Sequence, residues 1–339
     1  MKIAIVGANR KDSMEWHFSD AFHFAGHETK IFDIYDQFPY TLKSLKPYFQ
    51  TIDKVRRTYS DGYDQKRFLA LAKHVNNYRP DLIICFYKDI HPIFVDDVKN
   101  INQKVVHINP DQMSTLGYQQ VIASNYDAWF TKDHYMLDFM RNKAKLNAFI
   151  YNEAFNHRYN PKPSCSKAEM EKEVNIDVMT YGTLYPYRTR MMKALVNQGI
   201  DIKLFGIVPH RFFDTDVEKC CTGKYIVGDE KAQILYGSKV VFNNMHFAEI
   251  ESVNCRFFEA NGCGAFQLCD YKPILKELLP IDHELVTFKT IDEGVDKVKY
   301  YLAHPKERYE IAERIYQYFI NHYTYDHLIQ YILNVTKSL

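Results

Sequence analysis

Short apolar runs alternate with segments of helical periodicity along most of the chain, and this alternation limits the fold more than any other feature. The runs predicted as strands lie at residues 3–6, 29–34, 81–86, 105–108 and 128–130, and again at 176–181, 202–205, 240–243, 266–268 and 285–288. Segments predicted as helices separate them at residues 15–24, 66–77, 187–196 and 231–236, and the pattern is helical from residue 292 onward. This order favours an α/β fold with parallel sheets covered on both faces.

The length of the chain, 339 residues, favours two domains. The best linker between the two strand–helix series runs from Pro161 to Ser166, where proline and serine gather. We therefore predict a first Rossmann-like domain at residues 1–160 and a second at residues 167–322.

Charge and cysteine usage exclude several classes of protein. Lys and Arg number 43 against 42 Asp and Glu, so no basic excess points to nucleic acid. No apolar run approaches the length of a membrane span, and the first run is better explained as a strand than as a secretion signal. The seven cysteines show neither a paired CxxC pattern nor zinc-ligand spacing. We therefore expect reduced thiols, no metal site and a cytoplasmic location.

Groups suited to a phosphate ligand follow the predicted strands of the second domain. Ligands of open α/β sheets bind beyond the carboxyl ends of the strands. Gly182 ends one strand, and Arg188 and Arg190 open the next helix, where a guanidinium and a helix N-terminus together suit a diphosphate. Gly206 ends the following strand, and the backbone of Val227 could pair with a base edge. Turn glycines and surface arginines are the alternative explanation.

The segment ESVNCRFFEANGCGAFQLCD, residues 251–270, is the most specific of these signals. It has Glu251 in a predicted loop and Glu259 in a short predicted helix, while Gly262 and Gly264 suit the end of that helix and a tight turn into the next strand. Two glutamates at this spacing also arise by chance, as a solvated loop residue and a helix-surface residue. Four weak signals in the same order nevertheless favour a nucleotide site.

From about Tyr126 to its end, the chain resembles the CgeB-type (spore maturation protein B-like) glycosyltransferases. The resemblance is carried by YDAWFTKD, YNEAFNHRYNP, VMTYGTLYPYR, IKLFG, YIVGDEKAQILYGSKVVFNN, NCRFFEANGCGAFQLCD and YLAHPKERYEIAERI with HYTYDH. These blocks span roughly two-thirds of the chain, and NCRFFEANGCG is the most specific of them. The residues before Tyr126 match only as a generic Rossmann-like half.

The resemblance implies a GT-B fold, in which two Rossmann-like domains face each other across a cleft. It implies a nucleotide-diphosphate-sugar donor, with a UDP-sugar favoured, held by the C-terminal domain without a required metal. Arg188 would neutralise the diphosphate, and Glu259 would hold the ribose. The predicted donor site is completed by Gly182, Arg190, Gly206, Val227, Asn254 and Arg256.

The resemblance also implies that the first domain serves the acceptor and that the C-terminal helix, residues 323–339, packs back on that domain. The pattern agrees, because an apolar stripe at helical spacing needs a partner surface. The stripe consists of Leu328, Ile329, Ile332 and Leu333.

The stereochemistry of transfer is left open by the sequence. Glu251 departs from the family pattern, since that position is often not acidic in CgeB-like chains, and it favours retention of configuration. Inversion would instead need a base from the first domain. The strand-end candidates for that base are Asp12, His17, Asp89, His91 and Asp111. We take Arg188, Glu251 and Asp111 as the catalytic candidates.

Two further questions stay open at this stage. The acceptor is a glycan, a lipid-linked glycan or a protein, and peripheral contact with a membrane is compatible with the sequence. The chain is alternatively a non-catalytic GT-B-like partner subunit that binds nucleotide sugar, or a GT-B epimerase or phosphorylase.

We also predict that Glu259→Ala weakens nucleotide binding with little effect on the fold.

Overall fold

The computed structural model describes the chain from Met1 to Leu339 except residues 37–44, 88, 102, 112–121 and 209–213. The described residues form two compact units. The first consists of Met1–Asn152 and Leu328–Leu339, and the second of Glu153–His327. Each unit has its own parallel sheet and its own hydrophobic core.

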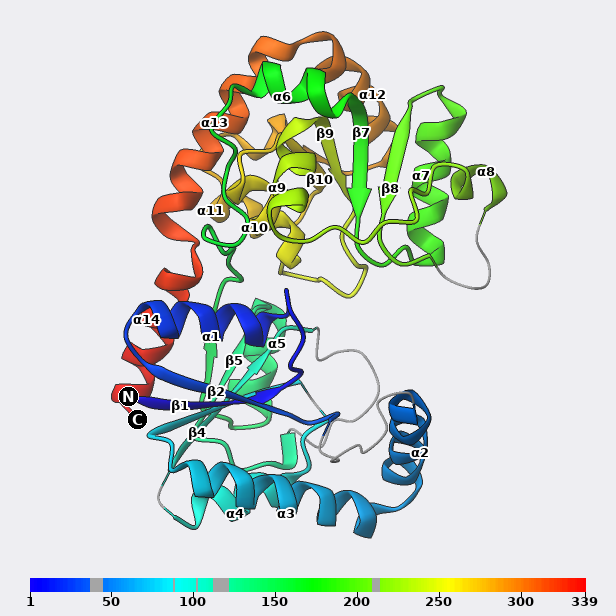
Figure 1. Ribbon diagram of the computed structural model, residues 1–339. Coiled ribbons are helices and arrows are strands. Elements are labelled where there is room, and N and C mark those ends of the chain that lie inside the picture. Colours follow the sequence, from blue (N-terminus) through cyan, green and yellow to red (C-terminus); the bar gives the residue numbers. More distant parts are fainter. Residues whose placement is uncertain (37–44, 88, 102, 112–121, 209–213) are drawn as a thin grey trace. The chain divides into compact units, whose positions relative to one another are not determined.

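The first unit is built on a six-stranded parallel sheet in the order β2-β1-β3-β4-β5-β6. Its strands are β1 (Lys2–Gly7), β2 (Glu28–Asp33), β3 (Leu82–Phe86), β4 (Lys104–Asn109), β5 (Ala128–Thr131) and β6 (Ala148–Ile150). Its helices are α1 (Met14–Phe24), α2 (Lys46–Tyr59), α3 (Asp61–Tyr78), α4 (Pro92–Lys99) and α5 (His134–Asp138), with a π-helical turn at Phe139–Lys143. Helices α3 and α4 cover one face of the sheet and α1 the other (Figure 1), so β3 is buried at every position.

The second unit is built on a five-stranded parallel sheet in the order β11-β10-β9-β7-β8. Its strands are β7 (Ile176–Tyr181), β8 (Ile202–Phe205), β9 (Ser238–Asn243), β10 (Gln267–Asp270) and β11 (Thr287–Phe288). Its helices are α6 (Lys167–Val174), α7 (Pro186–Asn197), α8 (Thr215–Glu218), α9 (Gly228–Gly237), α10 (Cys255–Gly262), α11 (Leu275–Leu278), α12 (Ile291–Ala303) and α13 (Pro305–His322), with a 3-10 turn at His283–Leu285.

Alternating side chains of the central strands fill two separate cores in the second unit. Val178 and Val240 pack in a cluster that also holds apolar residues of α7, α12 and α13. Their neighbours Met179 and Val241 pack in a cluster with residues of α9 and α10. Because successive strand residues point to opposite faces, helices must cover both sides of this sheet. This is the doubly wound arrangement that the sequence predicts for each half.

The chain passes from the first unit to the second at Asn152–Glu153, before the segment predicted as a linker. The residues that follow this point pack on the second unit. The Phe155 amide donates to the Tyr323 carbonyl at 3.0 Å, and Arg158 Nη1 contacts Asp326 Oδ1 and Oδ2 at 2.9 and 2.7 Å. Gly262 is needed beside Phe155, because an added Cβ would lie 2.2 Å from the phenyl ring.

The last helix, α14 (Tyr325–Lys337), brings its apolar stripe into the first unit. Leu328, Ile329, Ile332 and Leu333 are all buried. Two polar contacts accompany this packing: Tyr331 Oη donates to the Ile150 carbonyl at 2.8 Å, and Lys104 Nζ donates to the Thr336 carbonyl at 2.9 Å.

Most predicted strands and helices are confirmed to within a few residues. The strand predicted at 285–288 is shorter, because residues 283–285 form a 3-10 turn and only Thr287–Phe288 pair with β10. Strand β6 and helices α2, α4, α5, α6, α8 and α11 have no counterpart in the prediction. Helix α2 was not predicted because Asp53 is its only buried residue, so its sequence shows no apolar face at helical spacing that is directed at a core. None of the described helices is long and apolar enough to cross a membrane.

Candidate functional site

Two of the predicted donor-site residues, Gly182 and Gly206, lie at the carboxyl ends of neighbouring strands in the second unit, and the others lie on helices that follow strands of the same sheet or at the N-termini of those helices. Strand β7 runs into Gly182, β8 into Gly206, β9 into Asn244, and β10 ends at Asp270. The sheet order brings these ends together along one edge. The helix α10 that contains Glu259 connects β9 to β10.

Two buried arginines converge on Gly182. A Cβ added to this glycine would lie 3.5 Å from Arg256 Cδ and 4.0 Å from Arg188 Nη1, and the positive φ of 98° also suits glycine. The Arg256 guanidinium donates hydrogen bonds to two backbone carbonyls. Its Nη1 donates to the Tyr181 carbonyl at 2.8 Å, and its Nη2 donates to the Asn244 carbonyl at 3.1 Å. The side chain of Arg256 thereby ties the ends of β7 and β9 together.

Arg188 keeps unused donor capacity. Its Nη1 donates to the Thr183 carbonyl at 2.8 Å, but its buried Nε has no hydrogen-bond partner among the residues that the structure describes. Only 5% of the residue is exposed. A buried guanidinium donor without an acceptor is costly, and an anionic ligand would remove that cost. Arg188 lies in the first turn of α7, which begins at Pro186, and the free amides of that turn add to the positive potential.

Glu259 is held between two buried groups. Its Oε2 accepts from Tyr181 Oη at 3.0 Å, and its Oε1 accepts from Lys231 Nζ at 3.0 Å. The side chain of Glu259 is 15% exposed and that of Lys231 only 3%. Burial, with the nearby Glu259 charge, raises the pKa of Tyr181 well above its usual value, so this hydroxyl remains a donor. Because Glu259→Ala removes a partner of the buried Lys231 ammonium, we now expect this substitution to affect stability as well as nucleotide binding.

Lys231 and Asp270 are two members of this cluster that sequence reasoning missed as site residues. Lys231 lies on α9 without a motif, and only the folding of α9 against α10 brings it to Glu259. Asp270 is the last residue of β10, and it accepts the amide of Met245. Desolvation raises the pKa of the Asp270 carboxyl to about 6, against the lowering influence of the Met245 amide, Lys272 and Arg188. Its place at a strand end was the available signal.

Two of the other predicted residues have structural roles. An added Cβ at Gly206 would lie 2.3 Å from the Gly182 carbonyl oxygen, and φ is 124°, so the backbone of Gly182 already requires glycine there. The Asn254 side chain caps α10 by accepting the Phe257 amide at 3.1 Å, and its Nδ2 donates to Asn243.

The remaining predicted residues lie at the margins of the cluster. Val227 is the N-cap residue of α9, and Glu251 lies half-buried in the loop between β9 and α10. Arg190 is exposed on α7, and two residues along a helix correspond to a rotation of roughly 200°, so its side chain leaves the helix on the side opposite to Arg188. Asp111 belongs to the first unit, where it is exposed just beyond β4.

The candidate bases of the first unit are engaged by neighbouring groups. His17 Nε2 lies 3.2 Å from Asp12 Oδ1, and both side chains are buried. His91 caps α4 by accepting the Ile93 amide, and its Nε2 lies 3.1 Å from Asp61 Oδ1. Asp89 Oδ2 accepts from Tyr35 Oη at 2.9 Å.

Sequence comparison finds similarity to glycosyltransferases in the second half of the chain. Residues 188–334 match the family model described as Glycosyl transferase-like. The chain is also 23% identical over 234 residues to spore protein CgeB of Bacillus subtilis (strain 168), which covers 59% of this chain and 71% of that protein.

Solved structures match the fold over nearly the whole chain. Sucrose-phosphate synthase from Thermosynechococcus elongatus aligns with a TM-score of 0.69 at 11% identity, covering 99% of this chain and 98% of that one. A glycosyltransferase from Rickettsia africae aligns at 0.67 with 12% identity, over 99% and 98% of the two chains. HepE of Anabaena, solved in complex with UDP, aligns at 0.61 with 12% identity over 100% of both.

These matches confirm the GT-B fold and the resemblance to CgeB-like proteins that the sequence predicts. The match to the Glycosyl transferase-like family includes Arg188 and the paired residues Lys231 and Glu259. The chain is a glycosyltransferase with a GT-B fold and a resemblance to the CgeB-like family.

Proposed function

We propose that the chain transfers a sugar from a nucleotide-diphosphate-sugar donor, with a UDP-sugar favoured, to an acceptor that is a glycan, a lipid-linked glycan or a protein. The second unit holds the donor, and the first unit serves the acceptor. The observation that carries this proposal is the buried Arg188 guanidinium in the first turn of α7, whose Nε has no hydrogen-bond partner among the described residues. The Glu259 carboxylate, which accepts from Tyr181 at the end of β7, adds to it. The structure of HepE with UDP supports the choice of nucleotide.

In this proposal Glu259 accepts hydrogen bonds from the two ribose hydroxyls. Its two oxygens each have one protein donor, and a carboxylate oxygen has a further lone pair for a ligand. Lys231 and Tyr181 hold the carboxylate in place, which lowers the entropy lost when the nucleotide binds.

Arg188 acts on the departing group. Negative charge develops on the nucleoside diphosphate as the glycosidic bond breaks, and a guanidinium at a helix N-terminus stabilises that charge. We propose that this arrangement serves in place of a metal ion. We further propose retention of configuration, with Glu251 near the donor sugar and the acceptor attacking from the face of the leaving group. The leaving phosphate then takes the acceptor proton.

A thermal-shift panel of UDP, GDP, ADP and dTDP, followed by the corresponding hexose conjugates, tests the donor site. One nucleotide should stabilise the chain by about 2.7 kcal/mol at a hundredfold excess over its dissociation constant. Addition of EDTA should leave the shift unchanged. Absence of any shift at millimolar nucleotide would overturn the donor-site proposal.

Two arginine variants give the matched test. Arg188→Ala should lower release of nucleoside diphosphate from the donor, whereas Arg314→Ala removes an exposed arginine of α13 and should not. The products also report stereochemistry, because proton NMR distinguishes the two anomers. An inverted product would remove the role proposed for Glu251 and require a base from the first unit, for which Asp12, His17, Asp89, His91 and Asp111 are the candidates.

A further inference from the structure

A pocket of about 650 Å³ lies within the first unit, at the carboxyl ends of three neighbouring strands. Arg10 follows β1, Tyr35 follows β2 and Asp89 follows β3, and these strands are adjacent in the order β2-β1-β3. The hydrogen bond from Tyr35 Oη to Asp89 Oδ2 joins the two outer strand ends. Pockets of this volume at the carboxyl edge of a parallel sheet are common ligand sites.

Helix α2 forms one wall of the pocket with its polar side. The wall consists of Pro47, Gln50, Thr51, Asp53, Lys54, Arg57 and Thr58. Large apolar side chains of the same helix are exposed instead, namely Tyr48, Phe49, Val55 and Tyr59. Most surface helices bury the apolar side and expose the polar one. The reversed orientation of α2 places its polar side along the pocket and beside polar side chains of α3.

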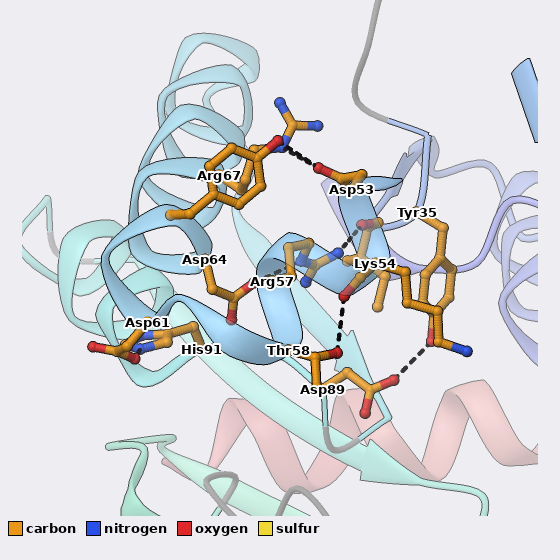
Figure 2. A network of polar contacts seen from close by, with 12 residues as sticks. Tyr35, Asp53, Lys54, Arg57, Thr58, Asp61, Asp64, Arg67, Asp89 and His91 are labelled. Atoms are coloured by element: carbon orange, nitrogen blue, oxygen red, sulfur yellow. Dashed lines mark hydrogen bonds and ion pairs between the residues drawn. The ribbon is translucent and has the colours of Figure 1, made fainter. Parts of the chain in front are cut away.

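Most charges around this wall are neutralised within the protein. Arg57 Nε contacts Asp64 Oδ1 at 2.6 Å, and Arg57 Nη1 also donates to the Ile34 carbonyl. Asp53 lies 3.5 Å from Arg67 Nε. Figure 2 shows these pairs together with Tyr35 and Asp89. The pairs give the pocket a polar wall whose geometry is set before a ligand arrives.

Three charged side chains remain for a ligand. Arg10 and Lys54 are exposed, and neither forms an ion pair with any residue that the structure describes. Asp89 is half-buried and receives the Tyr35 hydroxyl on one oxygen, which leaves Oδ1 able to accept another hydroxyl. The pocket therefore offers two cations and one hydroxyl acceptor among polar side chains.

We propose that this pocket binds the acceptor as a saccharide that carries a carboxylate or phosphate group. Arg10 and Lys54 bind the anionic group, and Asp89 accepts a hydrogen bond from a sugar hydroxyl. A neutral sugar satisfies Asp89 but gives neither cation an anionic partner, although Arg10 also lies over the Tyr35 ring, so the anionic saccharide is preferred. The inference rests on the proposed transfer reaction only in naming this ligand the acceptor.

Saturation-transfer NMR with the full chain tests the proposal directly. Glucuronate supplies the carboxylate, glucose 6-phosphate supplies the phosphate, and glucose is the neutral reference. At least one of the two anionic sugars should bind about tenfold more tightly than glucose at low salt, and the preference should shrink as salt is added. Binding of glucose as tight as that of both anionic sugars, or no binding of either anionic sugar, would overturn the proposal.

Variants then assign the binding to this pocket. Arg10→Ala/Lys54→Ala should abolish the preference for the anionic sugar, and Asp89→Asn should weaken binding of both charged and neutral sugars. The control Lys66→Ala/Lys73→Ala removes two exposed cations of α3 and should bind as the parent does. A double variant of Arg10 and Lys54 that keeps the preference would overturn the assignment.

A separate titration with UDP distinguishes this inference from the proposed function. The pocket variants should bind UDP as the parent does, because none of the substituted residues lies in the second unit. Saccharide binding that depends on Arg10 and Lys54 in a chain that binds no nucleotide would support the pocket and refute the donor site. Nucleotide binding without saccharide binding would do the reverse.

Discussion

Removing the Glu259 carboxylate should destabilise the second unit as well as weaken nucleotide binding. The carboxylate lies 3.0 Å from the Lys231 ammonium and 3.0 Å from the Tyr181 hydroxyl. Glu259→Ala takes this ion-pair partner from a lysine side chain that is only 3% exposed, and it leaves a small cavity in α10. The two consequences have different physical origins and can be measured apart.

The magnitude follows from the burial of the pair. Breaking a buried pair by removing one partner costs about 3–5 kcal/mol, and the 15% exposure of the Glu259 side chain places this pair near the lower value. For a unit of this size, about 3 kcal/mol corresponds to a fall in melting temperature of roughly 6–12 °C. Differential scanning calorimetry of the parent and of Glu259→Ala measures the difference.

A second substitution separates stability from binding. Glu259→Ala/Lys231→Met removes both charges, and replacing a buried pair with apolar groups is often neutral for stability. The double variant should therefore melt closer to the parent than the single variant does. Its affinity for UDP should stay low, because each lost ribose hydrogen bond to a charged group is worth about 1.5–3 kcal/mol. A single variant that melts like the parent, or a double variant that binds UDP like the parent, would refute the reasoning.

Four other changes test separate parts of the structure. Arg188→Ala should lower the rate of sugar transfer by about a hundredfold or more and the affinity for UDP much less, because the opposing charge grows in the transition state; equal losses in both would contradict this role. Gly206→Ala should lower the free energy of unfolding by more than about 3 kcal/mol, whereas Gly223→Ala, with positive φ but no atom within 4 Å, should cost about 1–2 kcal/mol; similar melting temperatures for the two would be inconsistent with the contact at Gly182. The Asp270 carboxyl has a pKa of about 6 in the folded chain against an ordinary 3.8, so folding favours its protonated form. Its contribution to the free energy of unfolding should therefore fall by roughly 3 kcal/mol as the pH rises from 4 to 6. In thermal melts, Asp270→Asn should lose this part of the pH dependence of stability. Deletion of residues 325–339 should lower the melting temperature, because it removes the buried side chains of Leu328, Ile329, Ile332 and Leu333 and exposes the apolar surface that they cover. A deletion variant that melts like the parent would show that the helix is dispensable.

The sequence predicts the strands of both sheets well because their signal is local. Runs such as residues 82–86 are apolar without interruption, and a strand covered on both faces requires that composition. Glycines at strand ends are equally easy to recognise in the sequence. The sequence does not show why Gly206 must be glycine, because the Gly182 backbone that excludes a Cβ there follows a different strand.

The partners of the site residues could not be predicted for the same reason. Lys231 and Glu259 are brought together only by the packing of α9 beside α10, and no spacing rule connects them. The unused Nε of Arg188 depends on which carbonyl its Nη1 contacts, a detail of the turn at Thr183. Helix α2 was missed because its apolar residues face solvent, so the usual link between pattern and burial fails there.

Hydrogen–deuterium exchange with and without a nucleotide tests the central claim, a donor site in the second unit, most directly. The nucleotide from the panel that stabilises the chain most should be used at saturation. We expect slower exchange in three segments: residues 182–190, residues 226–232 and residues 254–260. Unchanged exchange in all three segments, or protection confined to the first unit, would contradict the account.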